Sequence, residues 1–253
     1  MRRSRPSRDR RLPPERRRLL TERLIWWPLA DSAQQAVLER LTVDFAATKS
    51  FEGSVGFDPT DDMIATIAAH ACRLIVGLDL GWYRDVTTII VYPSVAVRPG
   101  TRNLDGGIAS DDPTTLAGEA MLHGPVMLAW DEVLTDTRHP ERGRNVVFHE
   151  FAHKLDMADG SAGGVPDLRS REAYRRWKGI MGKALDDLRT GEPRFIDSYG
   201  AVGPAELFAV ATEAFFTVPG DLRNREPEIY ALLRDFYRQD PAVPRTDPGM
   251  ERP

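Results

Sequence analysis

The residues best suited to chemistry in this chain of 253 residues lie in the segment 145–156, whose centre reads His-Glu-x-x-His. If the segment is helical, His149 and His153 lie on one face, four residues apart, so both imidazoles can reach a single point. Two neutral imidazoles suit Zn²⁺, which binds nitrogen at about 2.0–2.1 Å. Glu150 is rotated by about 100° from His149, where a general base for a zinc-bound water must stand. The pattern predicts a catalytic zinc site with one ion per chain.

The alternative is a core helix whose two histidines donate hydrogen bonds to backbone carbonyls. The apolar residues around the motif fit a buried helix in either case. Burying two imidazoles and a carboxylate side by side without a metal, however, leaves polar groups that need partners. Zinc is therefore the favoured interpretation.

A third protein ligand is expected, because a catalytic zinc usually has three and an open position for water. The one cysteine, Cys72, lies in an apolar run and reads as a packed thiol, and no histidine follows His153. Two carboxylates remain on the apolar helix expected over 205–216, Glu206 and Glu213, seven residues apart on one face. Either can be the ligand, and either can instead be an ion-pair residue.

Around this motif the sequence predicts a mostly helical α+β fold, zincin-like, with a small β-sheet beside the His-Glu-x-x-His helix. Helices are expected from Asp31 through Phe45, from Thr60 through Ile75, and over 145–156, 170–190, 205–216 and the segment after Pro227. Strands are expected over 87–92 and 125–130. Loops are expected over 51–59, 98–124 and from Asp131 to the zinc helix.

The arginine-rich residues 1–22 are predicted to be a disordered basic tail, and residues 241–253 a frayed one. Residues 23–240 are predicted to form a single peptidase domain, with an N-terminal helical part over 23–80 and a catalytic core over 81–240. The net charge of −4 gives no general basic surface, so no direct contact with nucleic acid is expected. No apolar run approaches the ~20 residues of a membrane span. A single cysteine fits a reducing compartment, and a cytoplasmic location is predicted.

Several motifs occur together in this chain: Gly124-Pro125 with the strand after it, His149 to Asp156, Gly164-Val165-Pro166, and Tyr199 followed by Pro204-Ala205-Glu206. In this combination they resemble the Mlc titration factor A (MtfA) family of zinc peptidases. The likeness runs from about Leu24 to Asp240. The catalytic core is also similar to the protease domain of anthrax lethal factor.

The resemblance implies that Glu206 is the third zinc ligand and that Glu213 supports the site from behind. It implies that Tyr199 stabilises the oxyanion while Glu150 serves as the base. It also implies aminopeptidase-like activity on peptides. Asp156 either orients a ligand imidazole through its free N–H or is a charge at the end of the helix.

In one respect the chain departs from the family. Some members carry a histidine in the loop before the Gly-Pro strand, and it blocks the zinc. Residues 108–113 contain no histidine here. Either Asp111 or Asp112 supplies an oxygen ligand instead, or the site is open. His123 does not align with the blocking histidine.

The family name also implies a second role, binding an Mlc-like repressor of sugar-uptake genes. The alternative function is therefore chiefly that of a non-catalytic regulator that sequesters a transcriptional repressor. A DNA-binding role for the arginine tail is the weakest interpretation.

Overall fold

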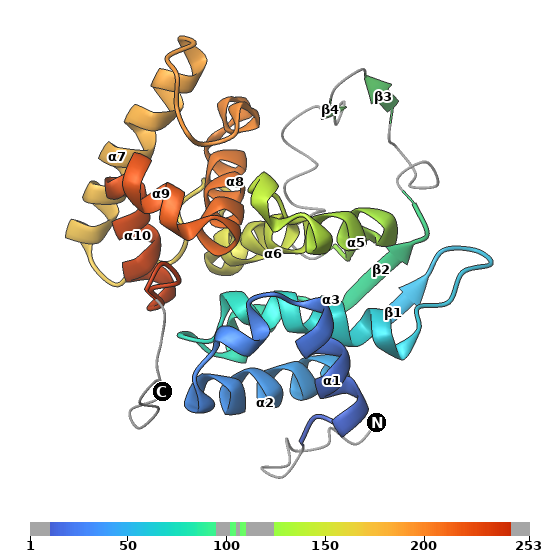
Figure 1. Ribbon diagram of the computed structural model, residues 1–253. Coiled ribbons are helices and arrows are strands. Elements are labelled where there is room, and N and C mark those ends of the chain that lie inside the picture. Colours follow the sequence, from blue (N-terminus) through green and yellow to red (C-terminus); the bar gives the residue numbers. More distant parts are fainter. Residues whose placement is uncertain (1–10, 95–101, 105–106, 110–123, 244–253) are drawn as a thin grey trace.

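The computed structural model describes residues 11–94, 102–104, 107–109 and 124–243. The helices in chain order are α1 (Pro14–Arg23), α2 (Ser32–Thr48), α3 (Asp61–Leu74), α5 (Trp130–Arg138), α6 (Val146–Asp156), α7 (Arg171–Arg189), α8 (Pro204–Thr217), α9 (Pro219–Arg225) and α10 (Pro227–Tyr237). Figure 1 shows α6 near the middle, with the N-terminal helices on one side of it and α7 to α10 on the other. The fold is mostly helical α+β, as predicted.

A small parallel sheet lies beside α6 and consists of β1 (Ser50–Gly53), β2 (Thr88–Tyr92) and β5 (Val126–Ala129), in the order β1-β2-β5. Ile89 is paired with Val126 and Val91 with Leu128, and all four side chains are buried. Among the described strands, β5 is an edge strand that pairs only with β2. A short antiparallel pair, β3 (Arg102–Leu104) and β4 (Gly107–Ala109), is separate from this sheet.

The sheet is fixed to α6 at its edge. Lys154 on α6 donates a hydrogen bond from Nζ to the carbonyl of Gly124, just before β5, at 3.0 Å. The edge strand therefore starts next to the second histidine of the motif.

Helix α8 is an interior helix, as its composition predicts. Ten consecutive residues, 207–216, are buried, and nine of the ten are not charged. A helix that is apolar on all sides must pack against several neighbours, and α8 contacts α6, α7, α9 and α10. The exception is Glu213, whose buried carboxylate needs a polar partner.

The N-terminal tail prediction is wrong for the residues that the structure describes. Residues 14–23 form α1, and Leu12, Leu20 and Leu24 are buried in a second apolar cluster with side chains of α2 and α3. Arginines that were predicted to belong to the disordered tail form ion pairs. Arg17, for example, is paired with Glu39 at 2.7 Å. Residues 1–10 lie outside the described chain.

All three predicted loops contain regular structure, and the one over 98–124 includes β3 and β4. Residues 50–53 form β1, because its backbone pairs with β2, a partner far away in sequence. Residues 130–138 form α5, although Asp and Thr are weak helix formers. Its buried Val133 and Thr137 and its contacts with α6 explain why packing prevails there over intrinsic preference. The other predicted helices and both strands are confirmed within a few residues.

Within the described residues, no helix combines the length and apolar character that a membrane crossing requires.

Candidate metal centre

Three potential metal ligands converge between α6 and α8. The ligand atoms of His149, His153 and Glu206 all lie within 4.8 Å of one another. His149 Nε2 is 3.1 Å from Glu206 Oε2 and 3.1 Å from His153 Nε2, and His153 Nε2 is 3.5 Å from Glu206 Oε2. Ligand atoms on neighbouring corners of a tetrahedral zinc site lie about 3.3 Å apart. The three distances fit such a site.

The chemistry of the donors supports a metal as well. Glu206 Oε2 is buried and has no hydrogen-bond partner of suitable geometry among the described residues, although both imidazoles face it. Two nitrogens and one oxygen directed at one point form the donor set of the catalytic zinc sites with two histidines and one glutamate. The residues present fit the ion.

The ligands are positioned by two helices that pack against each other. Helix α6 begins at Val146, and its N-cap Asn145 accepts a hydrogen bond from Phe148 N at 3.0 Å. The opposite face of α6 packs into the core through Val147, Phe151 and Leu155. The motif therefore projects its histidines toward α8, whose first turn carries Glu206. The contact between α6 and α8 completes the ligand set.

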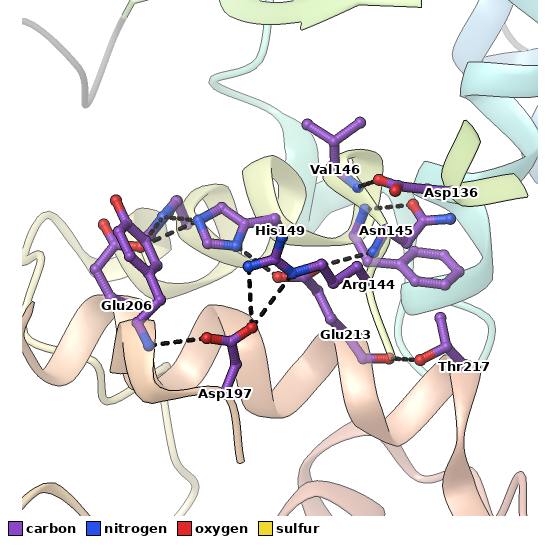
Figure 2. A network of polar contacts seen from close by, with 12 residues as sticks. Asp136, Arg144, Asn145, Val146, His149, Asp197, Glu206, Glu213 and Thr217 are labelled. Carbon is purple, nitrogen blue, oxygen red and sulfur yellow. Dashed lines mark hydrogen bonds and ion pairs between the residues drawn. The ribbon is translucent and has the colours of Figure 1, made fainter. Parts of the chain in front are cut away.

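Behind the ligands, Glu213 connects the site to the start of α6 (Figure 2). Its Oε1 lies 2.7 Å from His149 Nδ1, and its Oε2 accepts a hydrogen bond from Asn145 N at 2.6 Å. A carboxylate on Nδ1 favours the proton at that nitrogen, which leaves Nε2 free to bind a metal. The two glutamates of α8 thus face opposite nitrogens of one ring.

The electrostatics show how strongly these groups interact. Burial lowers the pKa of His149, but the carboxylates of Glu206 and Glu213 outweigh burial and raise that pKa to about 10. Burial raises the pKa of Glu206, whereas the close approach of the two histidines depresses it well below its ordinary value. Burial raises the pKa of Glu213. The cluster favours a positive charge at its centre, which a metal ion supplies.

Tyr199 lies beside His149, and Glu150 directly follows His149 in α6. The rings of Tyr199 and His149 have their centroids 6.1 Å apart. Burial, followed by the charges of Glu206 and Glu150, raises the pKa of Tyr199. The tyrosine hydroxyl therefore stays protonated and can donate a hydrogen bond.

The contacts that hold Tyr199 in place were not predicted from the sequence. Tyr199 lies in the short helix Ser198–Val202, where its N–H donates to Asp197 Oδ1 at 2.9 Å. The other oxygen of Asp197 accepts from Arg144 Nη2 at 3.0 Å (Figure 2). Arg144 directly precedes Asn145, the N-cap of α6. This ion pair therefore connects the segment of Tyr199 to α6. An aspartate two residues before a tyrosine is the only local signal for it.

Asp156 does not have either of its two expected roles. Its side chain is fully buried, so it is not a surface charge at the helix end. Its Oδ2 accepts a hydrogen bond from Gly164 N at 2.9 Å, and Oδ1 has no hydrogen-bond partner among the described residues. The carboxylate on a ligand imidazole is that of Glu213. Asp111, Asp112 and His123 lie outside the described residues.

Comparison with known proteins gives a consistent result. A profile of the family described as glucose-regulated metallo-peptidase M90 matches residues 1–238. An uncharacterized protein of Synechocystis sp. is 36% identical over 240 residues, which cover 93% of this chain and 87% of that protein. The Mlc titration factor A of Edwardsiella ictaluri is 35% identical over 198 residues, covering 76% and 75%. That of Klebsiella pneumoniae is 30% identical over 227 residues, covering 87% and 84%.

Proposed function

Because the chain belongs to the glucose-regulated metallo-peptidase M90 family, we propose that it hydrolyses peptide bonds at a zinc site formed by His149, His153 and Glu206. The observation that carries the proposal is the convergence of these three ligand atoms within 4.8 Å, from helices far apart in sequence. When bound, zinc polarises the scissile carbonyl and lowers the pKa of a water molecule. The remaining steps belong to residues of the chain.

Glu150 is the proposed general base. It accepts the proton of the attacking water and passes it to the leaving amine. Tyr199, which stays protonated, donates a hydrogen bond to the oxygen that becomes negative as the carbonyl is attacked. Glu213 holds His149 in the tautomer that presents Nε2 to the metal.

The edge of β5 that is unpaired among the described strands is the proposed substrate-binding edge. An extended peptide can pair its backbone with an edge strand, which places the scissile bond at a fixed distance from the residues next to the strand. In the described part of the sheet, β5 has one free edge and starts beside Lys154 of the metal helix. An extended peptide is thus the proposed substrate class.

The test of this proposal is zinc content and peptide hydrolysis in one series of variants. Wild-type protein is expected to bind about one zinc per chain, and His153→Ala and Glu206→Ala to lose it. Glu150→Gln is expected to keep the zinc while hydrolysis falls by about 10²–10⁴-fold. Glu172→Gln, on the exposed side of α7, is the matched control that leaves both unchanged. Full activity in Glu150→Gln would remove Glu150 as the base.

Whether cleavage is aminopeptidase-like is a finer proposal that rests on the family resemblance. It is tested with one peptide supplied with a free or an acetylated N-terminus. An aminopeptidase cleaves only the free form, so equal cleavage of both would favour an endopeptidase.

A regulatory role is the second candidate, and it is favoured by the name Mlc titration factor A of the relatives. We propose that the chain also binds an Mlc-like repressor, with or without catalysis. A repressor that is retained equally by wild-type protein and by His149→Ala or Glu150→Gln would separate binding from hydrolysis. Loss of retention in these variants would tie the two together.

A further inference from the structure

A large groove lies at the N-terminal end of α6. Its volume is about 1040 Å³. It is lined by the segment from Leu24 to Asp31, by α9, and by the chain that follows α10, and Figure 1 shows these parts in relation to α3 and α6. None of the proposed metal ligands or catalytic residues lines it. Asn145, the N-cap of α6, and Phe148 in its first turn line the groove, which therefore lies at the start of the helix that carries the ligands.

The groove is acidic. Its lining holds one basic side chain that is always charged, Arg73, and five carboxylates: Asp31, Asp136, Glu141, Asp221 and Asp240. Arg73 is itself packed over the rings of Trp26 and Phe216, 5.2 and 5.7 Å from their centroids. His70 adds no charge near neutral pH, because burial lowers its pKa to about 3. A ligand that fits this charge is cationic.

The groove is also apolar at its rim. Six large apolar side chains are exposed among the described residues, and three of them line this groove. They are Ile25 at 65%, Leu29 at 69% and Val243 at 48% exposure. Apolar groups clustered between charges are typical of protein interaction sites rather than of an ordinary solvated surface.

From this combination we infer that the groove binds a segment of another protein that carries apolar residues together with arginine or lysine. The apolar side chains of the segment cover Ile25 and Leu29, and its cations face the carboxylates. None of the proposed metal ligands lines this groove, and its occupation does not require hydrolysis.

The test is binding of a fluorescent peptide of about twelve leucine and arginine residues with helical spacing, measured by anisotropy on the full-length protein. A matched peptide with glutamate in place of arginine is the first control. We expect only the cationic peptide to bind, and we expect Asp221→Lys and the double variant Ile25→Ser, Leu29→Ser each to weaken it about tenfold or more. Glu172→Lys and Val55→Ser, exposed residues outside the groove, should change affinity by less than about twofold.

Photo-crosslinking locates the bound peptide, and crosslinks to 24–31 or 217–224 are expected. Equal affinity of the groove variants and wild type for the peptide, or crosslinks confined to the surroundings of His149, His153 and Glu206, would overturn the inference. A higher peptide affinity after removal of 244–253 would assign the groove to the chain's own C-terminal segment. Dimerisation that is lost in Ile25→Ser, Leu29→Ser would assign it to a second copy. Either result would also overturn the proposal of a foreign partner.

Discussion

At the scale of single residues, the orientation of the His149 ring depends on a contact that the His-Glu-x-x-His motif does not reveal. Its Nδ1 is held by Glu213, which also accepts the backbone N–H of Asn145. One carboxylate thereby fixes both the ring and the start of the helix that carries it. The zinc affinity of the site is expected to depend on Glu213 although it does not face the metal.

We predict that Glu213→Gln lowers zinc affinity about 10–100-fold. The amide keeps the shape of the side chain but has one acceptor in place of two and no charge. Competition with a chromogenic chelator measures the affinity. Glu172→Gln is the control, and unchanged zinc affinity in Glu213→Gln would show that the contact with His149 has no effect on the metal.

The buried environment of His70 leads to a second prediction at this scale. It is buried, with Nε2 3.1 Å from Thr137 Oγ1 and Nδ1 3.4 Å from Asn145 Nδ2. Burial lowers its pKa from 6.5 to about 3. Between these two pH values the unfolded chain binds a proton that the folded chain does not, so stability falls as the pH falls.

We therefore expect His70→Gln to reduce the loss of unfolding free energy on acidification. The reduction should approach about 1.4 kcal/mol per pH unit between pH 6 and 4. Urea unfolding of metal-free protein across this range measures it. His139→Gln serves as the control, because His139 is exposed. Parallel pH dependences of wild type and His70→Gln would contradict the prediction.

At the scale of elements, the site exists because α8 is held close to α6. Gly164, in the loop after α6, has a φ of +68°. A Cβ at this position would lie 2.1 Å from the carbonyl oxygen of Pro204, the first residue of α8. The same glycine donates its N–H to Asp156 and accepts from Trp177 Nε1. Only glycine allows the loop this close to the turn that carries Glu206.

Gly164→Ala is thus expected to displace the first turn of α8. It should weaken zinc binding about tenfold or more and destabilise the fold by about 1–3 kcal/mol. The zinc titration and thermal unfolding report the two effects separately. Gly163→Ala is the neighbouring control, since a Cβ there meets nothing within 4 Å. Equal behaviour of both variants would show that the close contact is not needed.

At the scale of the whole molecule, two apolar clusters share α3. The main cluster surrounds α6 and α8, and the second joins α1 to α2 and α3. Leu20 of α1 is fully buried in the second cluster. Residues 14–23 are hence expected to contribute to stability as core residues do.

The prediction is that Leu20→Ala lowers the free energy of unfolding by about 2–5 kcal/mol. The expected cause is the cavity that remains in the second cluster. Leu29→Ala removes an exposed side chain of the same kind and should cost less than about 0.5 kcal/mol. Chemical denaturation measures both, and equal effects would mean that α1 does not hold its packed position in solution.

Patterns in the sequence were sufficient to predict the features that depend on neighbours along the chain. His149, Glu150 and His153 are positioned by the period of one helix, and its apolar flanks indicate burial before any contact is known. The same local rules located α2, α3 and α7, together with the helix that carries Glu206 and Glu213. The caps Asp31, Thr60 and Asn145 directly precede the helices α2, α3 and α6. The family of the chain also follows from the sequence.

The features that depend on how those elements pack against each other became clear from the three-dimensional contacts. Glu206 and Glu213 share one face of α8, and by residue type and spacing either could face a metal. The packing of α8 against α6 places Glu206 at Nε2 and Glu213 at Nδ1 of the same ring. The packed position of α1 likewise depends on α2 and α3. These helices bury Leu20 of α1, although the arginines around it are typical of a disordered tail. Such contacts join residues far apart in sequence, and no periodicity within a segment records them.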